Sequence, residues 1–157
     1  MQWAEVMADP CLRDLPYKIE LDRYGNIIMS PASNRHGRFQ LWTGSFLERC
    51  LGGEVICECS IQTPEGVKVA DVAWCSPEFL ARYGYQTPYP VAPEICVEVR
   101  SPSNAWEEMS QKTALYLQQG AHEVWVVLET GEVRFFGVEG ERTVSIFGID
   151  PRPELKH

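Results

Sequence analysis

The chain has 157 residues, 45% of them hydrophobic, and its 22 acidic side chains outnumber its 14 lysines and arginines, which gives a formal charge of −8. The length fits one domain over residues 1–157, and the composition is that of a globular protein. The charge argues against a protein that coats nucleic acid by electrostatic attraction alone, but not against a nuclease, because metal-binding acids add negative charge.

The sequence shows neither a membrane segment nor a secretion signal. No apolar run approaches the roughly 20 residues of a membrane helix, and the start, MQWAEVMADP, lacks the basic and apolar pattern of a signal peptide. None of the six cysteines forms a CxxC pair, so we expect reduced thiols rather than zinc ligands or disulfides. Four of them lie in or beside strand-like segments and should pack as small hydrophobic groups: Cys57, Cys59, Cys75 and Cys96. We therefore expect a cytoplasmic protein that has no membrane partner.

The first half of the chain predicts two hairpins with a helix between them. Two β-prone runs, 17–22 and 26–30, flank a short polar connection that contains glycine, which is typical of a hairpin. A helix is expected over 33–51, because a serine can cap its start and apolar residues recur at helical spacing. The runs 54–63 and 67–74 predict a second hairpin across a turn that contains proline and glycine.

The middle of the chain predicts a loop, a strand and a helix. Residues 75–93 are rich in proline, tyrosine and glycine, which favours a long surface loop whose aromatic side chains pack locally, with a base-stacking platform as the alternative. A short buried strand is expected over 94–100. A helix should follow over about 105–119, since Asn104 and Glu107 have the spacing of a capping box.

The last β-prone runs, 123–129 and 132–138, predict a closing hairpin across a threonine–glycine turn. The expected order is therefore hairpin, helix, three strands with a long loop, helix and hairpin. This order indicates one α/β domain with a mixed, largely antiparallel sheet flanked by helices.

An acid stands at the centre of each of two apolar strand-like runs, Asp71 in VADVAW and Glu98 in EICVEVR. A charge in such a place costs on the order of several kcal/mol unless something pairs with it. If the two strands are neighbours and the acids are aligned, their carboxylates converge and can hold one Mg2+ or Mn2+.

Lys112 completes the candidate site. The strand extends about 10 Å beyond Glu98, and the helix rises about 12 Å from Asn104 to Lys112, so a helix that folds back along its strand brings the lysine level with the second acid. A metal-bound water and a lysine ammonium suit phosphodiester hydrolysis. The alternative is that both acids lie at strand edges in solvent and that Lys112 is a surface lysine.

Four segments in this order resemble a known family: IELDRYGNIIMSPASNRHG, VKVADVAW, EICVEVRSPSN and QKTALYLQQGAHEVWVV. The resemblance covers about residues 15–149. It is to a large bacterial family of restriction-endonuclease-like proteins, long labelled a domain of unknown function, within the PD-(D/E)XK nuclease superfamily. It implies a restriction endonuclease-like α/β core with additional β-hairpins and metal-dependent endonuclease chemistry that uses Mg2+ or Mn2+.

The resemblance also implies roles for individual residues. The first acid of the family falls on Asp71, the second on Glu98, and the lysine, moved in this family to the following helix, on Lys112. The backbone carbonyl of Val99 is an additional metal ligand by the same resemblance. The N-terminal acidic position of the family matches Glu20, for which we expect a supporting role.

The sequence departs from the family pattern at two positions. Ala70 stands where the family has proline before the first acid, and since proline there acts on conformation, the chemistry is retained. Arg100 stands two residues after Glu98, where the superfamily carries its lysine, and is the rival of Lys112 or its supplement. We favour Lys112, because a compact ammonium suits this chemistry. His36 is interpreted as a local hydrogen-bonding residue rather than a ligand.

Three functions follow as hypotheses. The first is a metal-dependent endonuclease that acts on DNA, with RNA as the less favoured substrate. The second is a catalytically silent binding or assembly module that keeps the nuclease fold, and the third is a phosphoesterase that acts on a small substrate. Because cutting both strands requires two sites, we expect that the chain can form a homodimer.

Overall fold

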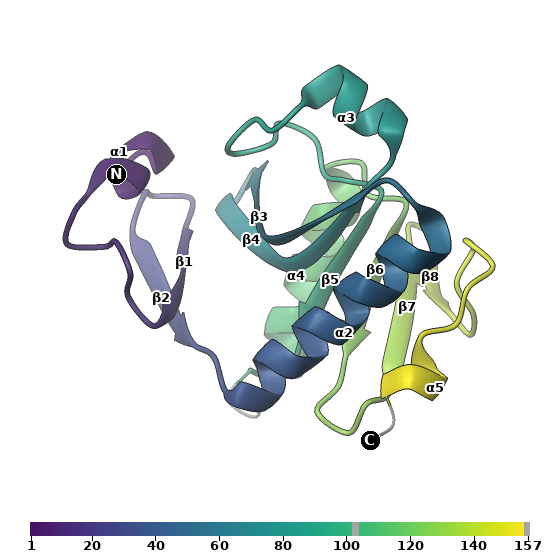
Figure 1. Ribbon diagram of the computed structural model, residues 1–157. Coiled ribbons are helices and arrows are strands. Elements are labelled where there is room, and N and C mark those ends of the chain that lie inside the picture. Colours follow the sequence, from purple (N-terminus) through teal and green to yellow (C-terminus); the bar gives the residue numbers. More distant parts are fainter. Residues whose placement is uncertain (102–103, 156–157) are drawn as a thin grey trace.

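The computed structural model of the protein describes residues 1–101 and 104–155, and these residues are built around a six-stranded mixed sheet (Figure 1). The strands lie in chain order, β3 to β8, and only the β5–β6 pair is parallel. Their bounds are β3 (Glu54–Thr63), β4 (Gly66–Cys75), β5 (Ile95–Val99), β6 (Glu123–Val127), β7 (Val133–Gly137) and β8 (Gly140–Arg142). The predicted mixed, largely antiparallel sheet is confirmed.

Two helices cover the two faces of the sheet: α2 (Asn34–Leu51) crosses in front of it in Figure 1, and α4 (Trp106–Gln118) lies behind it. Alternation along the strands separates the two cores. Val97 packs in the core that contains Phe46 of α2, whereas its neighbour Cys96 packs in the core that contains Tyr116 of α4. Glu98 therefore points to the face that α4 covers.

The starts of these helices differ in how they are capped. Ser33 caps α2 as predicted, because its hydroxyl accepts a hydrogen bond from the backbone N–H of His36 at 3.1 Å. The predicted capping box of α4 is wrong. The N-cap is Ala105, and the side-chain carbonyl of Asn104 instead accepts hydrogen bonds from the backbone and hydroxyl of Ser101.

A hairpin of β1 (Tyr17–Leu21) and β2 (Ile27–Pro31) forms a separate two-stranded sheet, which stands to the left of the main sheet in Figure 1 together with α1 (Trp3–Ala8). It is fixed to β4 by a small apolar core that includes Leu21 and Val69. Because side chains alternate along β1, Lys18 and Glu20 share the opposite side of this strand from Leu21.

The predicted long loop over 75–93 is wrong in part, because it contains the helix α3 (Pro77–Tyr83). The hydroxyl of Ser76 caps this helix and Gly84, with a φ of 57°, follows its last residue. Phe79 and Tyr89 are buried with their ring centroids 5.0 Å apart, which agrees with the predicted local packing of the aromatic side chains.

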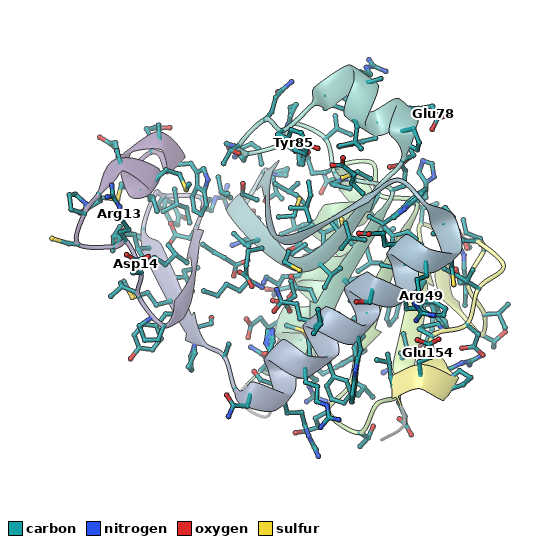
Figure 2. The ribbon with its side chains drawn as sticks, in the orientation of Figure 1. Arg13, Asp14, Arg49, Glu78, Tyr85 and Glu154 are labelled. Carbon is teal, nitrogen blue, oxygen red and sulfur yellow. The ribbon has the colours of Figure 1, made fainter. Side chains whose placement is uncertain are left out.

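The C-terminal segment is held to the sheet by a buried carboxylate and by an ion pair. Glu123 accepts hydrogen bonds from Trp125, Arg142 and Ser145 and from a backbone N–H. Arg49 of α2 pairs with Glu154 of α5 (Arg152–Leu155) at 2.5 Å, and Figure 2 shows the two side chains facing each other. Glu123 is therefore a structural acid with its own partners.

Two expectations about the whole chain concern membranes and cysteines. None of the helices within 1–101 and 104–155 has the length and hydropathy of a membrane span. All six cysteines carry free thiols, as expected. Of the four that should pack as small hydrophobic groups, Cys59, Cys75 and Cys96 are buried, whereas Cys57 is exposed.

Candidate functional site

Asp71 and Glu98 lie opposite each other on paired strands. The antiparallel register of β4 and β5 pairs Val72 with Val97, so the next pair along is Asp71 opposite Glu98. Both side chains are almost fully buried, with exposed fractions of 1% and 2%. The predicted alignment of the two acids is therefore observed, and the alternative that they lie in solvent at strand edges is wrong.

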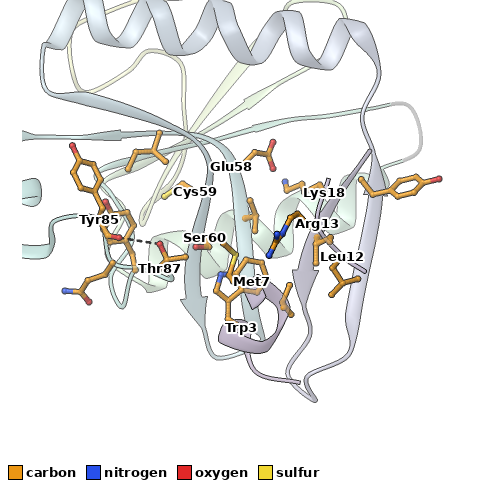
Figure 3. A pocket seen from close by; sticks show the side chains of 17 residues that line it. Trp3, Met7, Leu12, Arg13, Lys18, Glu58, Cys59, Ser60, Tyr85 and Thr87 are labelled. Atoms are coloured by element: carbon orange, nitrogen blue, oxygen red, sulfur yellow. Dashed lines mark hydrogen bonds between the residues drawn. The ribbon is translucent and has the colours of Figure 1, made fainter. Parts of the chain in front are cut away.

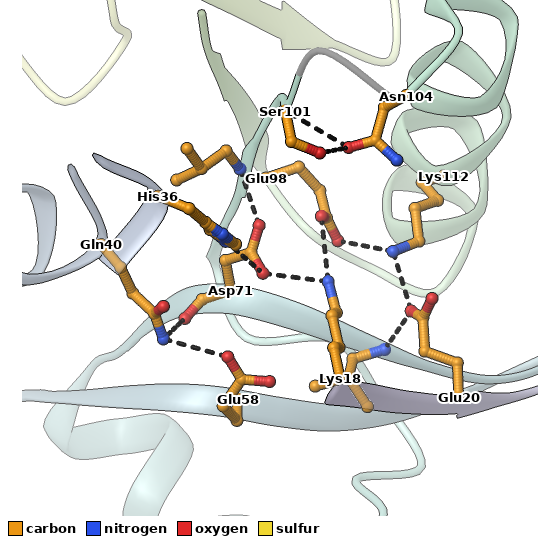
Figure 4. A network of polar contacts seen from close by, with 12 residues as sticks. Lys18, Glu20, His36, Gln40, Glu58, Asp71, Glu98, Ser101, Asn104 and Lys112 are labelled. Carbon is orange, nitrogen blue, oxygen red and sulfur yellow. Dashed lines mark hydrogen bonds and ion pairs between the residues drawn. The ribbon is translucent and has the colours of Figure 1, made fainter. Parts of the chain in front are cut away.

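Lys112 reaches the second acid from α4. Its Nζ lies 3.2 Å from Oε1 of Glu98 and 2.8 Å from Oε2 of Glu20, and the side chain is buried (Figure 4). The same Oε2 of Glu20 accepts a hydrogen bond from the backbone N–H of Val69. One turn after the lysine, the hydroxyl of Tyr116 donates to Oε1 of Glu98 at 2.7 Å. The face of α4 that carries Lys112 is therefore turned toward Glu98, which the sequence does not determine.

Lys18 is a second lysine in the site and is absent from the sequence prediction. Its Nζ lies 3.0 Å from Oδ1 of Asp71 and 3.2 Å from Oε2 of Glu98, so it bridges the two acids (Figure 4). The alternation of β1 places Lys18 on the same face as Glu20, but the sequence does not show that this face lies against the two acids.

His36 and Gln40 approach the first acid from the start of α2. The Nε2 atom of His36 is buried, lies 3.2 Å from Oδ1 of Asp71, and has no aligned hydrogen-bond partner among the described residues. Gln40 donates to the backbone carbonyl of Asp71 at 2.9 Å and to Oε1 of Glu58 at 3.1 Å. The interpretation of His36 as a local residue holds for its backbone only, since its ring faces the site.

The backbone of Glu58 has a conformation that residues other than glycine rarely adopt. It stands opposite Asp71 in the β3–β4 pair, between two regular partners, Cys57↔Val72 and Cys59↔Ala70. Its φ is 56°, in the left-handed region that costs a non-glycine residue on the order of 1–3 kcal/mol. The ladder is interrupted here, and Gln40 takes the carbonyl of Asp71 instead.

The charges of the cluster do not balance. Two ammonium groups, those of Lys18 and Lys112, face a larger set of carboxylates. The carboxylates are those of Glu20, Glu58, Asp71 and Glu98. When all four are ionised, they exceed the two ammonium groups by two negative charges. An excess of two equals the charge of one divalent cation.

The two central acids respond differently to this environment. Burial and the charge of Glu98 raise the pKa of Asp71. Burial acts in the same direction on Glu98, but Lys112 and Lys18 outweigh it, so the pKa of Glu98 is lowered. Burial and the Lys18 ammonium lower the pKa of His36, which keeps its ring neutral at pH 7.

The residues present fit a hard divalent cation. Lys18 places a positive charge between the two carboxylates, and the ring of His36 stands beside them with its Nε2 3.2 Å from Oδ1 of Asp71. Within the described residues, no group of three or more His, Cys, Asp or Glu side chains is arranged to hold a metal ion unaided. Water, substrate or backbone oxygens would have to complete the coordination, as is usual for Mg2+.

Two further predicted residues have recorded contacts. The backbone N–H of Val99 donates to Oδ2 of Asp71 at 2.7 Å, while the role of its carbonyl as a metal ligand stays a prediction. Arg100 donates to the carbonyl of Asn104 and stacks 5.8 Å from the ring centre of Trp106. Of the two rival cations, Lys112 and not Arg100 is the one in contact with the acids.

Two cavities share residues of the site. One of about 290 Å3 is lined by Asp71, Glu98 and Lys112, and a more apolar one of about 530 Å3 is lined by side chains of α1, β1 and β3 (Figure 3). Lys18 and Glu58 line both cavities. The side chain of Lys18 therefore belongs to the wall between them.

The chain is similar to known proteins in sequence and in fold. Residues 8–151 match the sequence model of the Uma2 family, whose description is "Putative restriction endonuclease". A solved structure described as a "putative nuclease belonging to DUF820" from Anabaena variabilis ATCC 29413 is similar, with a TM-score of 0.73 and 15% identity over 94% of this chain and 90% of the other. That likeness establishes a shared fold. No match was found among curated proteins.

Proposed function

Because the chain belongs to the Uma2 family of restriction-endonuclease-like proteins, we propose that it is a metal-dependent endonuclease that hydrolyses phosphodiester bonds in DNA. The observation that carries this proposal is the pair of buried carboxylates, Asp71 and Glu98, which converge beside a lysine in a cavity with excess negative charge. Such an arrangement is costly to bury unless a cation is drawn to it.

In this proposal Asp71, Glu98 and the backbone carbonyl of Val99 hold one Mg2+ or Mn2+. When bound, the cation supplies a water of lowered pKa and neutralises charge on the phosphate. The backbone N–H of Val99 donates to Oδ2 of Asp71 and so fixes this carboxylate. The hydroxyl of Tyr116 fixes the other by donating to Oε1 of Glu98. The remaining oxygens, Oδ1 and Oε2, face each other.

In this proposal Lys112 acts on the attacking water or on the phosphate. Its ammonium can orient the attacking water or stabilise the negative charge that develops on the pentavalent phosphorus. Glu20 has the supporting role of holding this ammonium, with its Oε2 2.8 Å from Nζ. His36 is neutral and its Nε2 lies 3.2 Å from Oδ1 of Asp71, so its ring can form a hydrogen bond with a water in the cavity. Arg100 has no part in this chemistry.

One observation favours the silent nuclease-fold module as the second candidate. Lys18 already pairs with both acids, and a network of paired charges is also what a structural site would keep. A phosphoesterase for a small substrate would use the same residues on a smaller ligand. A single domain over 1–157, a cytoplasmic location and a homodimer that cuts both strands belong to the proposal as well.

Incubation with plasmid DNA, single-stranded DNA and RNA in Mg2+ or Mn2+ tests the proposal. We expect the protein to cleave DNA, and D71N and E98Q to lower the rate by at least about 10²-fold. The variant E132Q, which changes an exposed glutamate outside the site, is the matched control, and circular dichroism checks that each variant is folded.

Full activity in both acid variants would move the chemistry elsewhere. Absence of cleavage of all three nucleic acids by the folded protein would favour the silent module. Hydrolysis of a small phosphodiester alone would favour the phosphoesterase.

A further inference from the structure

We propose that Lys18 is an internal counter-ion that occupies the metal position, so that a divalent cation binds only by displacing its ammonium toward Glu58. This inference rests on the proposed metal site at Asp71 and Glu98. It assigns functions to two residues, Lys18 and Glu58, that the chemistry of hydrolysis does not itself require.

One oxygen of each acid already has hydrogen-bond partners other than Lys18. Oδ2 of Asp71 accepts the N–H of Val99, and Oε1 of Glu98 accepts the hydroxyl of Tyr116 and the ammonium of Lys112. Oδ1 of Asp71 and Oε2 of Glu98 accept none of these hydrogen bonds, so they are the oxygens that we assign to a shared cation.

Lys18 contacts both of these oxygens, at 3.0 and 3.2 Å. A Mg2+ ion that bridged the same atoms would lie about 2.1 Å from each of them. Two cations cannot share that space, since they would stand within a few ångströms of each other in a buried site where charge repulsion is weakly screened. Binding of the metal and the present position of Lys18 are therefore mutually exclusive.

Lys112 is a built-in comparison, because it does not compete in this way. It contacts Oε1 of Glu98 and Oε2 of Glu20, which lie on the far side of the second acid from the bridging position. A cation between the two strands leaves both contacts of Lys112 intact. Of the two lysines in the cluster, Lys18 alone has to move.

The structure offers Lys18 space for a second position. Its side chain lines both the cavity over the acids and the adjoining apolar cavity of about 530 Å3, so the second cavity is the space into which its ammonium would turn (Figure 3). Figure 3 also shows Glu58 in the same wall, and the charge of Lys18 already acts on this carboxylate. Glu58 is the nearby anion that receives the displaced ammonium.

The unusual backbone of Glu58 is consistent with this role. A left-handed φ of 56° at a glutamate is strained, and strain of this kind persists where the surrounding structure requires it. Gln40 holds the Glu58 carboxylate at 3.1 Å while it also holds the backbone of Asp71. The receiving anion is therefore fixed beside the site.

The exchange can be measured by titrating the full chain with Mn2+ and following free Mn2+ by electron paramagnetic resonance. We expect K18M to bind Mn2+ about tenfold more tightly than the unchanged protein, because no ammonium has to leave. E58Q should bind it several-fold more weakly. K68M, which changes a lysine of β4 that donates to the carbonyl of Leu21, is the matched control and should bind unchanged.

A second readout is thermal stability. Without metal, K18M leaves two buried carboxylates without their shared cation, so its Tm should fall below that of the unchanged protein. Saturating Mn2+ should raise the Tm of K18M by more than it raises that of the unchanged protein. K18Q, which keeps a hydrogen-bond donor at this position, gives the same comparison if K18M does not fold.

Equal or weaker Mn2+ binding by K18M and K18Q overturns the inference, as does the absence of Mn2+ binding by any of the folded proteins. Tighter binding without cleavage of DNA would support the inference and contradict the proposed nuclease. Cleavage of DNA with unchanged Mn2+ affinity in K18M would contradict the inference and leave the nuclease standing.

Discussion

At the scale of single residues, the site depends on two acids that are buried alike but held differently. Asp71 is 1% exposed and Glu98 2%, yet the pKa of the first is raised and that of the second lowered. The difference comes from the partners of Glu98, which receives Lys112, Lys18 and Tyr116. Neighbouring groups therefore decide the ionisation of these carboxyls as much as burial does.

The raised pKa of Asp71 predicts a pH dependence of stability. Its pKa of about 7 in the folded protein, against an ordinary 3.8, means that its contribution to the free energy of unfolding is greatest below about pH 4 and is lost as the pH rises through 7. Glu98, with a lowered pKa, contributes in the opposite sense, and only at more acidic pH.

Urea unfolding of the metal-free protein and of D71N at pH 5 and pH 7.5 measures this contribution. The unchanged protein should lose stability relative to D71N between the two pH values. Parallel behaviour of the two proteins would show that Asp71 does not titrate in this range.

Lys112 and Arg100 were the two candidates for the catalytic cation, and their substitutions should affect the rate of DNA cleavage differently. K112M should reduce DNA cleavage by about 10² to 10³-fold, because it removes the ammonium beside Glu98. R100M removes a guanidinium that contacts Asn104 and Trp106 and should stay within about threefold of the unchanged protein. The reverse ranking in single-turnover rates would reinstate Arg100.

The hydroxyl of Tyr116 is predicted to stabilise the fold. It is buried and donates to Glu98 at 2.7 Å, so Y116F should lower the free energy of unfolding by about 1–3 kcal/mol. Y24F, which alters an exposed tyrosine of the β1–β2 turn, is the control. Equal stabilities in urea would mean that the hydrogen bond makes no net contribution.

At the scale of elements, the sequence predicted those parts of the site that depend on neighbouring segments. Periodicity placed each acid on one face of its strand, and rise per residue brought Lys112 level with Glu98, whereas the register of β4 and β5 and the face of α4 come from the structure. The sequence could not place β1 beside β4, because that contact depends on tertiary packing of a separate hairpin. Lys18 was missed for this reason.

The helix α3 and the strained strand β3 were missed for different reasons. The start of α3 rests on a single capping serine, Ser76, in a segment whose composition favours a loop. The left-handed backbone of Glu58 has no sequence signal at all, since glycine or asparagine is what such a position ordinarily shows.

The strain in β3 can be separated from the side chain of Glu58 by a pair of substitutions. E58G should be more stable than E58A by about 1 kcal/mol. Glycine adopts a φ of 56° without a steric penalty, whereas the Cβ atom of alanine retains that penalty. Both variants lack the carboxylate, so the difference in Tm reports the backbone alone. A more stable E58A would contradict the assignment of strain.

At the scale of the whole molecule, the architecture places the acids on paired strands of one sheet and brings their partners from three other elements. Lys112 comes from a helix on one face and Lys18 from a hairpin outside the main sheet, while His36 lies in the first turn of the helix on the other face (Figures 1 and 4). Only the folded chain assembles the cluster. For the proposed nuclease, a net charge of −8 means that contacts with DNA should be local to the cavity and its rim.

The most direct test of the central claim is a crystal structure of the protein with Mn2+, in which anomalous scattering locates the ion. We predict one peak within about 2.5 Å of Oδ1 of Asp71 and Oε2 of Glu98, with the ammonium of Lys18 turned toward Glu58. A peak bound elsewhere, or none between these oxygens at a Mn2+ concentration that supports cleavage, would contradict the account.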